Sequence, residues 1–188
     1  KRGYILAKAY IPQQQIVDGT VEIAVLEGRI GEVKIEGGHK HYSDEFIKKH
    51  FNPVIEQGAL KQDSLERAIL VLNEYPKLDV KTTLQAGKNP GTTDIIVTAK
   101  NSMPVNLTLD YNNFGSKYVS RHRFSAAADI GNFIAEGAVL SLRAVSGEDP
   151  DDLFFYRGQY SIPLNTLGSR LGVYYAGGDF EVGREFEI

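Results

Sequence analysis

The first part of the chain alternates between apolar and polar residues, which is the period-two pattern of β-strands. Three such stretches follow one another in residues 3–37, and the second has Val21, Ile23 and Val25 at every other position. Asp18 and Gly19 stand between the first two stretches, where a tight turn is needed. We therefore expect three strands in this region.

Residues 43–75 change to a helical period. Ser43, followed by two acidic residues, is the expected start of a first helix, and Pro53 is expected to close it. Asp63 is the expected start of a second helix, because it forms a capping-box pattern with Glu66. The apolar stripe of this second helix recurs at helical spacing through Leu65, Ala68, Ile69 and Leu72.

Two further strands are predicted after Pro76. Residues 78–86 and 93–100 alternate again, and residues 87–91, which contain Gly and Pro, join them as a hairpin. This part of the chain therefore reads as strand, two helices and two strands.

From Val105 onward no helical segment is predicted. Five alternating stretches follow at short spacing, separated by clusters of Gly, Asn, Asp and Pro, and the simplest topology for them is an antiparallel meander. In sequence the stretches are VNLTLDYNN, SRHRFSAAADI, GAVLSLRAVSG, LFFYRGQYSIPL and SRLGVYYAGG. The expected fold class is thus α+β followed by an all-β antiparallel meander.

The five stretches place apolar residues on one face and polar residues, with five arginines, on the other. A soluble sandwich and the wall of an outer-membrane β-barrel both show this alternation, and the pattern alone leaves the two open. Strands of about ten residues, and tyrosines that punctuate the apolar face, favour the barrel. In the barrel the arginines line the lumen: Arg121, Arg123, Arg143, Arg157 and Arg170.

Composition narrows the class of protein further. The chain has 188 residues, 42% of them hydrophobic, and its net charge of −3 gives no electrostatic footprint for nucleic acid. It has no cysteine, so it has neither a disulfide nor a thiolate site, and it has no apolar run of 18 residues. The chain begins with Lys1 rather than Met and stops inside a strand-like pattern, so we expect it to be a segment of a longer protein.

Candidate chemical sites are few. His39 and His41 could ligate a metal, but no further ligand stands at suitable spacing, and a solvated turn is the favoured interpretation. The acidic residues 148–152 lack the spacing of a calcium loop. No phosphate-binding or dinucleotide motif and no nucleophile with a base occurs. We therefore expect no catalytic residue, no metal, no cofactor and no small-molecule substrate.

The beginning of the chain resembles a known family. Gly3-Tyr4, residues 9–14 (AYIPQQ), Asp18-Gly19 and Glu27-Gly28 match elements at the end of the first periplasmic POTRA domain of the two-partner secretion transporters, outer-membrane proteins of the Omp85 superfamily. The sequences LERAILVLNEYP and PGTTDIIVTA resemble the second POTRA domain, and VNLTLDYNNFGSKYVSRHRF resembles the first barrel strands. One departure is Pro76-Lys77, where the family often has Pro-Gly.

The resemblance implies a domain organisation and a function. Residues 1–28 would end the first POTRA domain, 29–100 would form the second, and 101–188 would begin a transmembrane β-barrel. The protein would lie in the bacterial outer membrane with its POTRA region in the periplasm, bind the N-terminal domain of a secreted exoprotein, and export it without being an enzyme. An Omp85-type assembly factor for outer-membrane proteins and a soluble β-sandwich adhesin are the alternative functions.

A cargo-binding site is predicted on the second POTRA domain. The resemblance implies that residues 29–37 lie beyond residues 93–100, which leaves residues 78–86 as an open sheet edge. An extended cargo segment could add to such an edge by β-augmentation while its side chains dock against the neighbouring helix. The predicted contacts are Val80, Thr82 and Leu84 on the strand and Leu65 and Ile69 on the helix.

Overall fold

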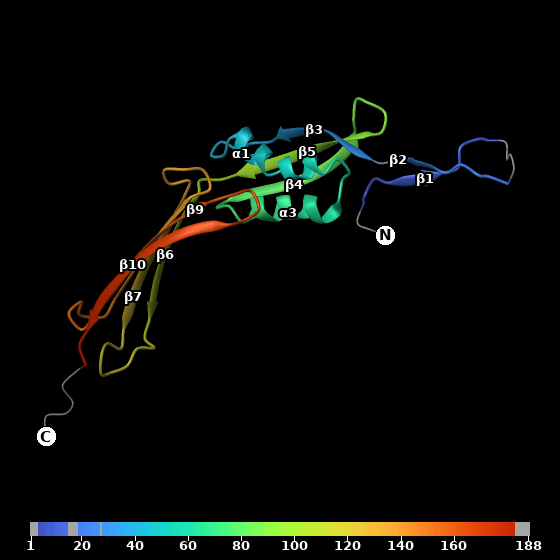
Figure 1. The fold of residues 1–188 in the computed structure, drawn as a ribbon. Helices are drawn as coiled ribbons and strands as arrows, with labels where there is room; N and C mark the ends of the chain where they lie inside the picture. Colours follow the sequence, from blue (N-terminus) through green and yellow to red (C-terminus); the bar gives the residue numbers. More distant parts are fainter. Residues whose placement is uncertain (1–3, 15–18, 27, 183–188) are drawn as a thin grey trace, which may run out of the picture. The chain divides into compact units, whose positions relative to one another are not determined.

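The structure is a computed structural model that describes residues 4–14, 19–26 and 28–182. It divides into two compact units, residues 1–102 and residues 103–188, each of which is described here by itself. Figure 1 labels their helices and strands.

The first unit begins with a small antiparallel sheet of β1 (Lys8–Tyr10) and β2 (Ala24–Leu26). Asp18, which was predicted in the turn before Gly19, lies outside the described residues. A three-stranded sheet follows, formed by β3 (Arg29–Glu36), β4 (Leu78–Ala86) and β5 (Thr92–Asn101). Its order is β3-β5-β4, with β3 parallel and β4 antiparallel to the central strand β5.

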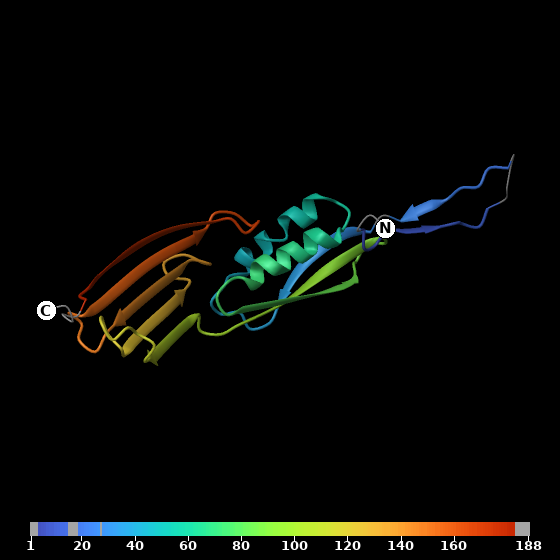
Figure 2. The same cartoon turned by 90° about the horizontal axis from the view of Figure 1, so that it is seen from below.

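Three helices lie between β3 and β4 in the sequence: α1 (Asp44–Lys49), α2 (Asn52–Glu56) and α3 (Gln62–Asn73). They cover one face of the three-stranded sheet (Figure 2). Their apolar sides and that face form the buried core of the unit, whose largest fully buried side chains include Ile47, Phe51, Leu72, Ile95 and Val97. Among the described residues, none of the helices is long and apolar enough to cross a membrane.

The predicted helix starts are partly right. Ser43 caps α1, because its hydroxyl accepts the backbone N–H of Phe46 at 3.1 Å. Pro53 does not close that helix; it lies in the first turn of the separate short helix α2, where its missing N–H costs no intrahelical bond. The capping box is wrong, since Lys61 is the N-cap residue of α3 without a side-chain cap, and Asp63 lies in the first helical turn.

The turn after α3 has an unusual backbone. Lys77 has a φ of +57°, in the left-handed region that glycine tolerates best. This is the position at which the sequence departs from Pro-Gly. The lysine therefore carries a steric strain that a glycine would not.

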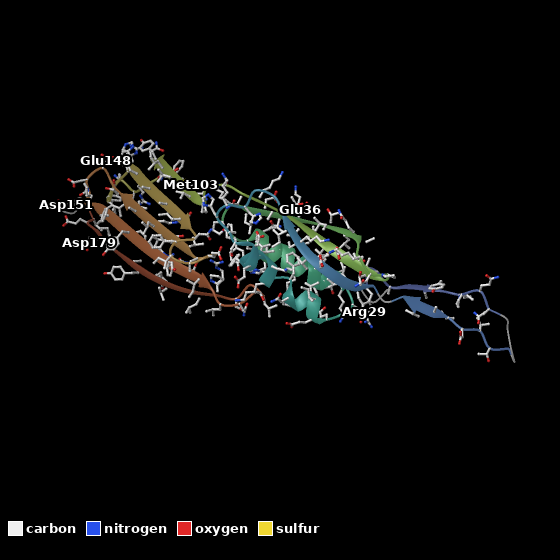
Figure 3. The ribbon with its side chains drawn as sticks, turned by 90° about the horizontal axis from the view of Figure 1, so that it is seen from above. Arg29, Glu36, Met103, Glu148, Asp151 and Asp179 are labelled. Atoms are coloured by element: carbon white, nitrogen blue, oxygen red, sulfur yellow. The ribbon has the colours of Figure 1, made fainter. Side chains whose placement is uncertain are left out.

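The second unit is one antiparallel sheet. It contains β6 (Val105–Asn112), β7 (Arg123–Gly131), β8 (Val139–Ser146), β9 (Leu153–Pro163) and β10 (Arg170–Phe180), and the strands pair in sequence order. Glu148, Asp151 and Asp179 lie at the end of this sheet opposite Met103, where the chain enters it (Figure 3). The predicted fold class, α+β followed by an antiparallel meander, is confirmed.

Candidate functional site

The outer edge of β4 is the first candidate site. Because β5 is the central strand of the sheet, β4 pairs on one side only. Along a regular antiparallel strand, the backbone groups of alternate residues point away from the partner strand. Val80 shows which residues of β4 these are. Its backbone N–H and C=O both bond to a side chain outside the sheet, so they point away from β5.

That side chain is the amide of Asn73, the last residue of α3. Its Oδ1 accepts the Val80 N–H at 2.7 Å, and its Nδ2 donates to the Val80 carbonyl oxygen at 3.1 Å. These bonds occupy the outward backbone groups of Val80, so an added strand cannot bond to the sheet edge at that residue. Since the pairing of β4 with β5 runs without a bulge, the outward groups further along the strand belong to Thr82 and Leu84.

The five residues predicted to contact cargo differ in how far their side chains are buried. Val80 is only 1% exposed and Leu65 only 7%, so both side chains belong to the core and cannot contact a docked segment unless the unit opens. This corrects their predicted role. Thr82, Leu84 and Ile69 are half-buried at the rim of the core and remain accessible.

A buried carboxylate stabilises the start of the same sheet. The ammonium of Lys34 donates to Asp94 at 2.6 Å, and the backbone N–H of Glu32 donates to the other carboxylate oxygen at 2.9 Å. The bond from Lys34, followed by that from Glu32, lowers the pKa of Asp94 below its usual value. These bonds secure the irregular segment between Ile30 and Val33, where the register of β3 against β5 shifts. The role of Asp94 is thus structural.

His50 is a buried titratable group beside the helices. One ring nitrogen lies 2.8 Å from the carbonyl oxygen of Phe46 and the other 3.0 Å from the hydroxyl of Tyr75. A neutral ring with its proton on Nδ1 satisfies both contacts, and burial lowers the pKa of His50. Its ring also meets Phe46 and Tyr75 edge to face, so it is part of an aromatic cluster rather than an exposed base.

The meander has two chemically different faces, as the alternation predicted. Leu107, Ala128, Leu142, Gly158 and Tyr175 stand opposite one another in a single row across all five strands. Leu107 and Tyr175 are each 71% exposed, so no second sheet among the described residues of this unit covers the apolar face. A soluble sandwich requires two packed sheets, and these five strands form only one.

Four of the five predicted arginines share the opposite face. Arg123, Arg143, Arg157 and Arg170 are at positions of one parity in the register of the sheet. Arg121 lies before the first residue of β7, in the loop of residues 113–122, so it is not part of the strand ladder. The prediction carried the alternating strand pattern back to Arg121, two residues before β7 begins.

The arginines differ in their contacts. Arg170 donates to the carbonyl oxygen of Gly137 at 2.8 Å, which ties β10 to the loop of residues 132–138. Arg157 donates to Gln159 at 2.7 Å, and its guanidinium lies 4.8 Å from the ring centroid of Tyr174. Tyr174 was not among the predicted residues of this face, although its position, one residue before Tyr175, places it beside the arginines.

The candidate metal sites stay isolated. His39 contacts Asp44 through Nε2 at 2.5 Å, and its Nδ1 is buried without a hydrogen-bond partner. Within the part of the chain that the structure describes, no three His, Asp or Glu side chains gather to hold a metal ion.

Comparison with known proteins identifies relatives of both units. A sequence model of the POTRA domain, ShlB-type, matches residues 1–28. The heme/hemopexin transporter protein HuxB of Haemophilus influenzae is 29% identical over 186 residues, a match that covers 95% of this chain and 33% of the relative. The outer membrane transporter CdiB of Escherichia coli O6:K15:H31 is 24% identical over 132 residues, which cover 70% of this chain and 22% of the relative.

Solved structures share the fold. CdiB from Escherichia coli superimposes with a TM-score of 0.71 at 19% identity, covering 94% of this chain and 33% of that one. BamA from Haemophilus ducreyi lacking POTRA domains 1–3 gives a TM-score of 0.61 at 23% identity, covering 95% and 34%. The chain spans about a third of the length of these relatives. Residues 1–28 thus match a POTRA domain, ShlB-type, and the chain as a whole is similar to the transporters HuxB and CdiB.

Proposed function

We propose that this chain takes part in the export of a partner exoprotein across the outer membrane. In this proposal residues 1–28 end a first POTRA domain, residues 29–100 form a second that captures the exoprotein in the periplasm, and residues 101–188 begin the barrel through which it leaves. No step of this process requires catalysis by the chain. The identity of the relatives as transporters supports the proposal.

The observation that carries the pore role is the two-faced meander. Its apolar face is exposed, with Leu109 at 75% and Val173 at 64%, as expected where side chains contact lipid. The opposite face carries four arginines together with Asp110, Asp129, Ser141 and Gln159, as expected for a water-filled lumen. The outer edges of β6 and β10 are unpaired within the described residues, and further strands would continue the sheet there.

Cargo capture is proposed at the open part of the β4 edge. Thr82 and Leu84 offer outward backbone groups, and the half-buried Ile69 lies on the helix that packs against this strand. An extended exoprotein segment would add as a fourth strand, with main-chain hydrogen bonds providing affinity. Lys81, whose side chain is 80% exposed, is the kind of residue that discourages unspecific pairing at a free edge.

A proline at this edge tests the docking role. Thr82→Pro removes an outward N–H but no bond to β5, whereas the control Thr82→Val keeps the backbone donor and the approximate side-chain shape. We expect Thr82→Pro to weaken capture of the exoprotein's N-terminal domain by residues 1–102 at least about tenfold, with Thr82→Val unchanged. Equal capture by both folded variants would exclude this edge as the docking site and leave the surface of α3 as the candidate.

A further inference from the structure

Two arginines stand directly opposite each other on the basic face of the meander. Arg143 of β8 and Arg157 of β9 are Cα partners in the register of the two strands. Directly opposed residues have Cβ atoms about 5 Å apart, and like charges at such positions destabilise a sheet. Ala127 and Ala176 are their outer neighbours in the same row, so the row carries no large side chain beside the pair.

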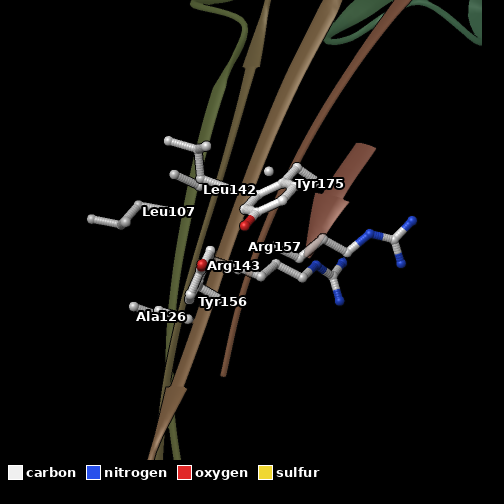
Figure 4. Close-up of a pocket in the computed structure, with 11 residues that line it drawn as sticks. Leu107, Ala126, Leu142, Arg143, Tyr156, Arg157 and Tyr175 are labelled. Atoms are coloured by element: carbon white, nitrogen blue, oxygen red, sulfur yellow. The ribbon is translucent and has the colours of Figure 1, made fainter. Parts of the chain in front are cut away.

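The pair lines a small polar pocket. Arg143, Arg157, Ser141 and Gln159 surround a volume of about 230 Å³. Figure 4, a close-up of another pocket, on the apolar side of the sheet, shows the two arginine side chains extending together, away from Leu107 and Leu142. The pocket holds several times the roughly 30 Å³ share of one water molecule, enough for a carboxylate group with its hydrogen-bond partners.

The charge of the pair is not neutralised from within the described sheet. Asp110 and Asp129 are the carboxylates in the two adjoining rows, and Asp129 accepts the hydroxyl of Ser141 at 2.5 Å. Among the residues that the structure describes, no carboxylate forms an ion pair with Arg143 or Arg157. Gln159 accepts from Arg157, and the ring of Tyr174 lies beside the same guanidinium, so two neighbours hold it in place.

We propose that the Arg143/Arg157 pair is a binding site for the carboxylate side chains of an acidic peptide segment inside the barrel. The inference rests on the proposed function, because it places the arginine face in the lumen, where a peptide passes. A carboxylate between two guanidinium groups relieves their repulsion and can accept paired N–H bonds from either. The pair would then give this part of the pore wall a preference for Asp and Glu.

A lipid phosphate is the other oxyanion that two arginines could bind, and the position of the pair argues against it. Arg143 is the fifth of the eight residues of β8, and Arg157 the fifth of the eleven residues of β9. Lipid phosphates lie at the membrane interfaces, beyond the apolar band that the middle of a strand crosses. The pair also lies on the face opposite the apolar side chains that would meet acyl chains.

Calorimetric titration of the full-length transporter in detergent with tetraglutamate tests the site. The variant Arg143→Gln/Arg157→Gln is compared with the control Lys117→Gln/Arg121→Gln, which removes the same charge from the loop of residues 113–122. We expect the first variant to bind tetraglutamate at least about tenfold more weakly than wild type, and the control to bind within about twofold. Arg143→Lys/Arg157→Lys should be intermediate, since it keeps the charge and loses the planar fork.

Heat-modifiable mobility on gels shows that each variant is folded, and export of the exoprotein is followed in parallel. Failure of wild type to bind tetraglutamate, or equal weakening in the variant and the control, overturns the site. Displacement of tetraglutamate by lower concentrations of lysophosphatidic acid overturns the peptide assignment. If the wild-type transporter exports the exoprotein but the arginine substitutions leave tetraglutamate binding unchanged, this inference alone is refuted. If tetraglutamate binding depends on the two arginines but the transporter does not export the exoprotein, the proposed function is refuted.

Discussion

Replacing Asn73 by alanine should open the closed end of the β4 edge. The substitution removes both hydrogen bonds between the Asn73 amide and the backbone of Val80, at 2.7 and 3.1 Å. Two such bonds contribute about 2 kcal/mol net, and the better helix propensity of alanine returns about 0.6 kcal/mol. The unfolding free energy of residues 1–102 should therefore fall by about 1.4 kcal/mol.

Urea unfolding and amide hydrogen exchange together check this prediction. With a slope of about 1 kcal/mol/M, the urea midpoint should fall by roughly 1.4 M. In the folded Asn73→Ala variant, the Val80 amide should exchange faster by an amount beyond the global loss of stability, because its only partner is gone. Asn73→Asp is the control that keeps the acceptor, and it should preserve more of this protection. A midpoint unchanged within 0.2 M, as a rough limit of precision, or an undiminished protection of Val80, would refute the reasoning.

Three further changes follow from single groups. Lys77→Gly should stabilise residues 1–102 by about 1 kcal/mol in urea unfolding, because relief of about 1–2 kcal/mol of left-handed strain exceeds the added flexibility of the unfolded chain; no gain would contradict the strain. The folded pKa of His50 lies below its unfolded value of 6.5, so the stability that this group contributes is present above pH 6.5 and is lost as the pH falls toward the folded pKa, by at most about 1.4 kcal/mol per pH unit. His50→Gln should flatten this dependence of the unfolding free energy on pH, and an equal slope in both proteins would exclude His50 as its source. Asp94→Asn should lower the urea midpoint at neutral pH, and its effect should shrink below the unfolded pKa of 3.8 as the folded carboxyl is also protonated, whereas a constant difference from pH 7 to pH 2 would exclude an ionic role.

The pattern of apolar residues predicted most of the fold because it reports burial directly. The stripe through Leu65, Ala68 and Leu72 located α3, and these residues are buried in the structure. The start of α3 was predicted wrongly, because Asp63 and Glu66 have the spacing of a capping box although their side chains do not cap the helix. Pro53 shows the same limit, because a proline can end one helix or begin the next.

The order and the two faces of the meander were predictable for a similar reason. Short connections join each strand to the next, and alternation then decides which face each residue occupies. The two faces follow from this rule, whereas the direct opposition of Arg143 and Arg157 depends on the register that the turn between β8 and β9 sets. Arg121 was misassigned because nothing in its own sequence marks the start of β7 at Arg123.

The contact of Asn73 with Val80 could not be predicted from the sequence. Asparagine at the end of a helix is ordinary, and its bond depends on how the following strand returns beside that end. The burial of Val80 and Leu65 likewise depends on how α3 packs on β4. The sequence therefore predicted the open edge correctly, while the three-dimensional packing decides which of its residues are accessible.

The orientation of the meander is the central claim, and spin-label accessibility along β8 tests it most directly. The chain has no cysteine, so single cysteines introduced from Val139 to Ser146 can each carry a label in the full-length transporter reconstituted in bilayers. Labels at Leu140, Leu142 and Ala144 should meet lipid-soluble oxygen, and labels at Ser141 and Arg143 should meet a water-soluble nickel complex. Exclusion of both reagents from positions 140, 142 and 144, as in a sandwich core, would contradict the account.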